Sequence, residues 1–225
     1  MDAWQPCGVK QEPVASLPER LRLGTRDLHA QTERTGAMAD LLAGRLALPG
    51  YCAMLRNLHA IYAALETGLL HQPPRAAVLQ LNAGPLHRTA ALGADLTALH
   101  GAPWRTELPL HPAAQAYAQR LQALSLAQSP ALVAHVYVRY LGDLHGGQIL
   151  KRLVARSLGL QGASGTRFYD FGDDAQVLAL RQGLRLALGA LVLDTADCET
   201  VVAEARWAFL QHQQIFTELA ALGQP

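Results

Sequence analysis

The chain has 225 residues, of which half are hydrophobic and 16% are charged, and its formal net charge is +1. This composition supports a sizeable core and lacks the basic excess typical of nucleic-acid-binding proteins. The three cysteines, Cys7, Cys52 and Cys198, are far apart and form no CxxC motif, which predicts a reducing compartment without disulfides. The N-terminus lacks a signal-peptide pattern, and no apolar run reaches the roughly 18 residues of a membrane span. We therefore expect a soluble, cytoplasmic protein without a membrane anchor.

Alanine and leucine are abundant and β-branched residues rarely run together, so the sequence predicts an all-α fold in a single domain. Residues 1–15 are expected to form a flexible leader, followed by the domain at 16–225. Ser16 and Glu19 have the spacing of a capping box, which predicts a helix that begins here and ends near Thr35.

Glycine and proline residues delimit the other predicted helices. In chain order, these cover residues 37–43, 49–72, about 75–82, 85–100, 112–127, 131–160, 174–193 and 197–221. Ser129 followed by Pro130 is a typical start for the helix at 131–160. The stretch between 161 and 173 is rich in glycine and is expected to be a loop.

One face of the first helix has an unusual composition. At 100° per residue, four polar side chains fall within a sector of about 60°: Arg22, Arg26, His29 and Glu33. One interpretation is a solvated face with charge pairs one turn apart. The other is a metal-ligating histidine oriented by a carboxylate, with two arginines ready for an anionic ligand.

The helix at 131–160 carries glycines where alanine would be more stable by about 1 kcal/mol each. Gly142, Asp143 and Gly146 lie on one side, and Gly147 is at the edge of that sector. Arg139 lies between them, and His135 lies two turns earlier. The glycines would suit either close helix packing or a groove for a flat ligand. Asp143 argues against tight packing, because a carboxylate there would need partners.

The segment "AHVYVRYLGDLHGGQIL" at residues 134–150 resembles the signature of the heme oxygenases, which is close to AHxYxRYLGDLSGGQ. The resemblance extends over residues 17–222. It includes "RDLHAQTE" in the first helix, "HAIYAALE" in the second long helix and "EARWAFLQHQQIFTEL" near the end.

The resemblance implies a heme held between two helices, with His29 as the proximal iron ligand and Glu33 supporting it. Gly142 and Gly146 would lie against the distal face, and Asp143 would anchor a water network. Arg139 and Tyr140 would serve hydrogen bonding and packing within the same motif. The remaining heme contacts implied by the family are Arg22, Arg26, Arg181, Arg185 and Tyr137 at the propionates, and Met38, Gly147 and Phe209 in the pocket.

The resemblance also implies the reaction. Heme b would be both substrate and cofactor, cleaved with O2 and reducing electrons to biliverdin, carbon monoxide and ferrous iron. An external electron donor would be required, such as ferredoxin or an NAD(P)H-dependent reductase. The register of Arg185 resembles that of α-selective members, which predicts the α isomer. The chain resembles the bacterial form, in which a bacteriophytochrome is a candidate acceptor of biliverdin.

Two positions depart from the family pattern. His145 stands where serine is common. It is expected either to modulate distal hydrogen bonding or helix opening, or to be merely structural, and a second iron ligand here would block oxygen. His212 stands where the mammalian enzymes have asparagine. A heme carrier on the same scaffold is an alternative function. A thiaminase-like enzyme would need a cysteine nucleophile in a suitable setting, and a di-iron bundle would need Glu-x-x-His repeats, and neither pattern is found.

Overall fold

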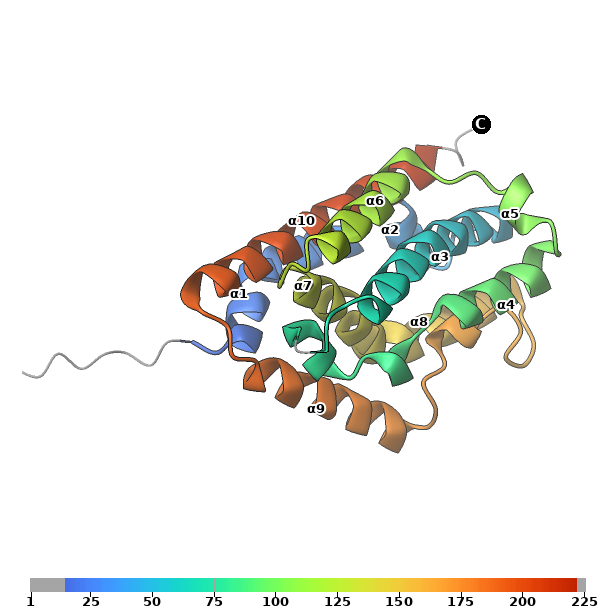
Figure 1. Ribbon diagram of the computed structural model, residues 1–225. Coiled ribbons are helices and arrows are strands. Elements are labelled where there is room, and N and C mark those ends of the chain that lie inside the picture. Colours follow the sequence, from blue (N-terminus) through green and yellow to red (C-terminus); the bar gives the residue numbers. More distant parts are fainter. Residues whose placement is uncertain (1–14, 75, 222–225) are drawn as a thin grey trace, which may run out of the picture.

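The computed structural model describes residues 15–74 and 76–221, and all regular elements in these ranges are helices (Figure 1). The α-helices are α1 Leu17–Glu33, α2 Gly36–Leu42, α3 Leu48–Leu70, α4 Thr89–His100, α5 Trp104–Glu107, α6 Pro112–Leu126, α7 Leu132–Val136, α8 Gly142–Leu158, α9 Asp174–Ala190 and α10 Thr195–Ala221. Shorter elements are η1 Ala77–Leu81, η2 Gly84–Leu86, the π-helical segment η3 Tyr137–Leu141, and η4 Arg167–Tyr169. The predicted all-α class is confirmed. The predicted leader falls outside the described residues except for Ala15.

Helix α3 is the centre of the packing, in contact with α6 on one side and α4 on another. Helix α10 runs along α1 and α6 and also contacts α2 and α7 (Figure 1). Large aromatic side chains fill the interior, among them Tyr51, Tyr62, Tyr117 and Tyr140, each without measurable exposure. The arrangement leaves α1 and α8 as two walls of a space that the core does not fill.

Most predicted helix boundaries agree with the structure, but the predicted capping box of α1 is wrong. Ser16 is the N-cap residue, yet its side chain makes no capping hydrogen bond. Pro18 in the first turn already lacks an N–H, so one of the unpaired donors that a cap would satisfy is missing. A capping box does form at α9, where Asp173 accepts from the Gln176 N–H at 2.8 Å and the Gln176 side chain accepts from the Asp173 N–H at 2.8 Å.

Three other segments differ from the sequence-based expectation. The stretch predicted as helix 75–82 forms only the short turn η1, and α4 begins at Thr89 instead of residue 85 because η2 precedes it. The helix at 131–160 is interrupted by η3, a π-helical segment directly before Gly142. Such insertions are frequent at functional sites, because they rotate the following residues relative to the preceding ones. No helix in the described ranges is long and apolar enough to cross a membrane.

Candidate functional site

A cavity of about 560 Å³ lies between α1 and α8, with further walls from α2, α3, α9, α10 and η4. Most site residues expected from the sequence line it: Arg22, His29, Glu33, Met38, Tyr137, Arg139, Gly142, Asp143, Gly146, Arg185 and Phe209. These residues come from five separate segments of the chain. The fold therefore brings the histidine face and the glycine face to opposite sides of one space.

His29 faces this cavity from α1, and its side chain is 57% exposed. Its Nδ1 lies 3.7 Å from the Glu33 carboxylate, close enough for attraction but beyond hydrogen-bonding distance. The Phe209 ring contacts the imidazole edge-on, with centroids 5.7 Å apart. Within the described part of the chain no group hydrogen-bonds to Nε2, so this nitrogen is available as a ligand to a metal.

Gly142 and Gly146 line the opposite wall, and a Cβ added to either would meet no atom within 4 Å. Close helix packing therefore does not explain these two glycines, because nothing packs against them. Gly147 is different. A Cβ there would touch Tyr169 at 3.8 Å, and the residue is buried against η4 and is not part of the cavity wall.

Two of the predicted arginines also lie outside the cavity wall. Arg26 is exposed on α1, and Arg181 is half-buried on α9, one turn before Arg185. Arg22 and Arg185 are both exposed, and both line the cavity. Of these four arginines, one on α1 and one on α9 therefore reach the cavity, in addition to Arg139.

Asp143 is nearly buried, with 10% of its side chain exposed, and is held by two neighbours. The Tyr62 hydroxyl donates to its Oδ2, and Arg139 lies 3.4 Å from its Oδ1. Burial raises the pKa of Asp143 above its ordinary value, although Arg139 and the Tyr62 hydrogen bond act in the opposite direction. The result is a fixed carboxyl group that holds a proton more readily than an exposed aspartate does.

Arg139 connects Asp143 to His212. Its guanidinium donates to the Tyr62 hydroxyl at 3.1 Å and to His212 Nε2 at 2.6 Å. Arginine has no acceptor, so His212 Nε2 must accept, and the proton is on Nδ1, which donates to the Ala208 carbonyl at 2.8 Å. Burial and the Arg139 charge lower the pKa of His212 to about 3, so this imidazole is neutral near pH 7.

His135 lies on the same stretch as Arg139 but does not reach the cavity. It is fully buried between the Tyr117 hydroxyl, 2.9 Å from Nδ1, and the Glu204 carboxylate, 3.2 Å from Nε2. Glu204 also pairs with Arg120 at 2.6 Å. Burial lowers the pKa of His135, so it bridges tyrosine and carboxylate as a neutral imidazole.

His145, the departure within the glycine motif, is exposed and lines the cavity. Its Nδ1 lies 2.6 Å from the Leu141 carbonyl, one turn earlier. A carbonyl can only accept, so Nδ1 carries a proton and the lone pair of a neutral ring is on Nε2. A serine at this position would offer a hydroxyl oxygen on a shorter side chain in place of the imidazole nitrogen.

Several residues in or behind the cavity wall could not be predicted as site residues from the neighbouring sequence. Met54, Leu58 and Tyr62 belong to α3, and Phe168 and Tyr169 belong to η4. All but Tyr62 line the cavity, and Tyr62 supports Asp143 from behind. Met54, Leu58 and Tyr62 follow the ordinary apolar spacing of a core helix, so nothing local distinguishes them from packing residues.

Known proteins are similar to this chain in sequence and in fold. A family model described as heme oxygenase matches residues 15–218. Heme oxygenase 1 of Nostoc is 35% identical over 205 residues, which cover 91% of this chain and 86% of that protein. Human heme oxygenase 1 is 34% identical, with 99% of this chain and 76% of that protein covered. The crystal structure of heme oxygenase-1 from the cyanobacterium Synechocystis in complex with heme has a TM-score of 0.86 and 34% identity, covering 92% of this chain and 94% of that one. The chain therefore belongs to the heme oxygenase family and is an oxidoreductase that degrades heme, its substrate and cofactor, to biliverdin, carbon monoxide and iron.

Proposed function

We propose that the cavity between α1 and α8 binds heme b with His29 as the iron ligand, and that cleavage yields the α isomer of biliverdin. The observation that carries this assignment is the pairing of an accessible imidazole on one wall with two unpacked glycines and a buried carboxyl group on the other. A flat ligand lying on the glycine backbone would use the space that side chains leave free. When bound, heme supplies the iron that activates O2 and the ring that is cleaved.

The residues of the cavity fit this ligand chemically. Imidazole nitrogen is a common iron ligand in heme proteins, and His29 Nε2 is free of protein partners in the described part of the chain. Arg22 and Arg185 supply guanidinium groups, which suit the two propionate carboxylates of heme. Tyr137, from η3, adds a hydroxyl donor to the cavity lining. Met38 and Phe209 supply apolar contact for the macrocycle.

Asp143 is proposed to position water and to hold a proton at its Oδ1 atom. Its Oδ2 is occupied by the Tyr62 hydroxyl, whereas the contact of Oδ1 with Arg139 is long, at 3.4 Å. Oδ1 therefore keeps capacity to accept a hydrogen bond from a water molecule in the cavity. The raised pKa of Asp143 favours proton transfer near neutral pH, because a general acid is most effective when its pKa approaches the working pH.

The direction of ring cleavage depends on how the propionates are held. Arg22 on α1 and Arg185 on α9 would hold the propionate carboxylates and so would determine which edge of the ring faces the glycine wall. Gly142 and Gly146 leave room at the opposite wall for O2. We propose that the α-meso edge of the ring would face the space beside Gly142 and Gly146. The basis is the position of Arg185 in the sequence, which is similar to that in α-selective members of the family.

Electrons are proposed to come from an external donor of the ferredoxin or NAD(P)H-dependent reductase class. Arg26 is exposed one turn from Arg22 and outside the cavity, so it offers positive charge for an acidic donor beside the heme edge. A bacteriophytochrome is the proposed acceptor of biliverdin. Replacing Arg26 with glutamate should slow electron transfer from ferredoxin and leave turnover with ascorbate unchanged.

The experiment that tests the proposed function is turnover of the heme complex. The purified chain is mixed with heme, then with ascorbate or ferredoxin and its reductase in air, and the Soret band is followed. Loss of the band with a green product identified as the α isomer by chromatography is the expected result. A stable Soret band under these conditions would instead indicate a heme carrier, and another isomer would overturn the proposed orientation.

A further inference from the structure

A second cavity, of about 590 Å³, lies outside the heme cavity, beside α4. Its polar lining comes from four elements: His59 on α3, Thr89 and Thr97 on α4, Arg105 on α5, and Arg167 at the start of η4. Gly93 forms part of its floor, where a Cβ would lie 3.9 Å from the His59 ring. None of these residues lines the heme cavity.

The charges around this second cavity are predominantly positive. Arg105 and Arg56 both lie over the Trp104 ring, at 4.1 and 5.6 Å from its centroid. Neither they nor Arg167 form an ion pair within residues 15–74 and 76–221. Burial and these two arginines lower the pKa of His59 to about 4, and burial together with Arg105 lowers the pKa of Arg56. Arg105 and Arg56 are like charges close enough to affect one another, whereas Arg167 has the Asp95 carboxyl nearby without a direct ion pair.

One buried donor of this lining also lacks an acceptor. The Thr89 hydroxyl is shielded from solvent and has no hydrogen-bond partner in the described part of the chain. Buried donors are rarely left unpaired in proteins, so this one needs an explanation. An anion in the cavity would supply the missing acceptor. The Arg56 Nε is also buried without a partner, but Arg56 does not line the cavity.

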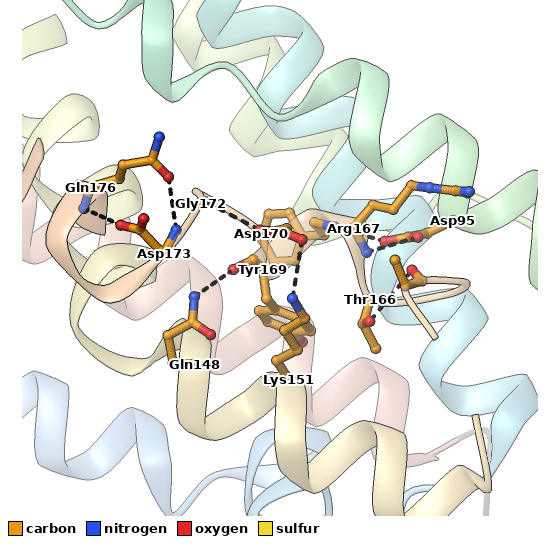
Figure 2. A network of polar contacts seen from close by, with 12 residues as sticks. Asp95, Gln148, Lys151, Thr166, Arg167, Tyr169, Asp170, Gly172, Asp173 and Gln176 are labelled. Atoms are coloured by element: carbon orange, nitrogen blue, oxygen red, sulfur yellow. Dashed lines mark hydrogen bonds and ion pairs between the residues drawn. The ribbon is translucent and has the colours of Figure 1, made fainter. Parts of the chain in front are cut away.

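The two nearby carboxylates are already occupied. Glu66 accepts from the backbone N–H groups of Arg88 and Thr89 and from the Tyr140 hydroxyl. Asp95 accepts from the backbone N–H groups of Arg167 and Phe168, at 3.0 and 2.8 Å. In Figure 2 the Arg167 side chain runs beside Asp95, and no contact is drawn to its guanidinium. The guanidinium is near enough for its charge to lower the pKa of Asp95, whose overall shift from burial is upward. The Arg167 backbone is thus held by Asp95, and its charged group forms no direct ion pair within the described residues.

We propose that this cavity binds a small oxyanion, a phosphate or carboxylate group, between the guanidinium groups of Arg105 and Arg167, with the Thr89 hydroxyl as a further donor. Charge-assisted hydrogen bonds from guanidinium groups to such oxygens are short and strong. The ligand regulates heme binding, because Arg167 is followed directly by Phe168 and Tyr169, which line the heme cavity. A ligand on the Arg167 side chain therefore adds to the Asp95 contacts that already hold this segment, and restrains that wall further.

Binding is tested with the whole chain by following the Trp104 indole N–H resonance, which reports on the cavity because Nε1 donates to Thr97 at 3.2 Å. The probes are inorganic phosphate and succinate, each compared with sodium chloride at equal ionic strength. A saturable shift with phosphate, with succinate or with both supports the site and identifies the oxyanion it takes. A shift that follows ionic strength alone, with no saturation by either probe, would overturn it.

The double variant Arg105→Gln/Arg167→Gln should weaken binding by about tenfold or more, the loss expected from removing two charge-assisted contacts. Thr89→Val removes one hydroxyl and should weaken binding by a few-fold, which keeps the test decisive if the double variant unfolds. The matched control is Arg156→Gln, an exposed arginine on α8 outside both cavities, which should bind like the parent chain. Equal binding by the parent and by both cavity variants would contradict the site.

Regulation is tested separately by heme titration of the parent chain with and without a saturating concentration of the bound oxyanion. The dissociation constant for heme should change by about twofold or more in the parent chain and stay constant in the double variant. An unchanged heme affinity with the oxyanion bound would overturn the regulatory role and leave the binding site standing. Neither the Trp104 resonance nor the heme titration measures heme cleavage. A negative result in these experiments can therefore be told apart from a failure of the proposed function.

Discussion

Gly142 and Gly146 lie one turn apart on α8, line the cavity between α1 and α8 together, and would each carry a Cβ without meeting any atom within 4 Å. Gly183 on α9 has the same free space around its Cβ position but lies outside the cavity. The three helical glycines therefore have the same unpacked surroundings, and they differ only in whether they line the cavity. Comparing them separates the effect of glycine on the free energy of unfolding from its effect on heme affinity.

Alanine at either cavity glycine should stabilise the heme-free protein and weaken heme binding. The gain in free energy of unfolding should be up to about 1 kcal/mol per site, the helix propensity difference between alanine and glycine. Gly183→Ala should give a similar gain with no change in heme affinity. Thermal unfolding of the heme-free chain and heme titration measure the two effects, and equal heme affinity in all three variants would contradict the assignment of the glycine wall.

The sequence predicted the helices and the cavity glycines well because both depend on local spacing. Gly142 and Gly146 are four residues apart, so they share a helix face even though η3 precedes them. Gly147 could not be placed in this way, because its environment is set by Tyr169, which reaches it from η4. The same reason hides the contact between Tyr62 and Asp143, which are 81 residues apart.

The positions of the arginines were only partly predictable. Arg22 and Arg26 share a sector of α1, and Arg181 and Arg185 share a sector of α9, so periodicity alone treats both members of each pair as equal. Of these four arginines, Arg22 and Arg185 line the cavity. Which arginine of each pair reaches the cavity depends on how the helices pack, and the residue spacing along one helix does not reveal it.

Each pair of arginines provides a matched test of propionate binding. Arg22→Gln and Arg185→Gln should weaken heme binding by about tenfold each, the equivalent of about 1.4 kcal/mol for a lost charge-assisted contact. Arg26→Gln and Arg181→Gln, their neighbours outside the wall, should bind heme like the parent chain. Heme titration measures the affinities, and product chromatography shows whether the Arg185 variant releases a mixture of isomers. Equal losses at all four positions would indicate a general charge effect instead of specific contacts.

His29→Ala should lose the histidine-ligated heme spectrum while keeping the fold. The side chain is 57% exposed, so its removal leaves no large cavity in the core, and the unfolding free energy should change by less than about 0.5 kcal/mol. Added imidazole should restore the spectrum by entering the space left by the side chain. A histidine-type spectrum in the variant without imidazole would show that another residue is the ligand.

Asp143→Ala should retain heme binding but lose most biliverdin formation, by about a hundredfold, the usual scale for a lost proton-transfer group. Asp143→Asn is the closer control, because the amide keeps an oxygen for the Tyr62 hydroxyl but cannot hold the proton. Both variants should keep the His29-ligated spectrum, measured before reductant is added. Normal turnover in either variant would contradict the role of Asp143 in positioning water and holding a proton.

His212 should make the stability of the heme-free protein depend on pH below neutrality. Its pKa is about 3 in the folded chain against 6.5 in an ordinary histidine, so the unfolded chain binds the extra proton first. The contribution is complete above pH 6.5 and is lost as the pH falls toward 3, by about 2 kcal/mol between pH 6.5 and 5. His212→Asn should remove this dependence while its amide oxygen still accepts from Arg139.

His212→Leu separates the hydrogen bond from the titration. It also lacks a titrating group, but it leaves the Arg139 guanidinium without the acceptor it now has at 2.6 Å. The leucine variant should therefore be less stable than the asparagine variant by about 2 kcal/mol at pH 7, the scale of a lost hydrogen bond to a buried charge. Because Arg139 also contacts Asp143, the pKa of water bound to the ferric heme should shift in the leucine variant and stay near the parent value in the asparagine variant. Urea unfolding and a spectroscopic pH titration measure the two effects, and identical results for both substitutions would show that His212 only fills space.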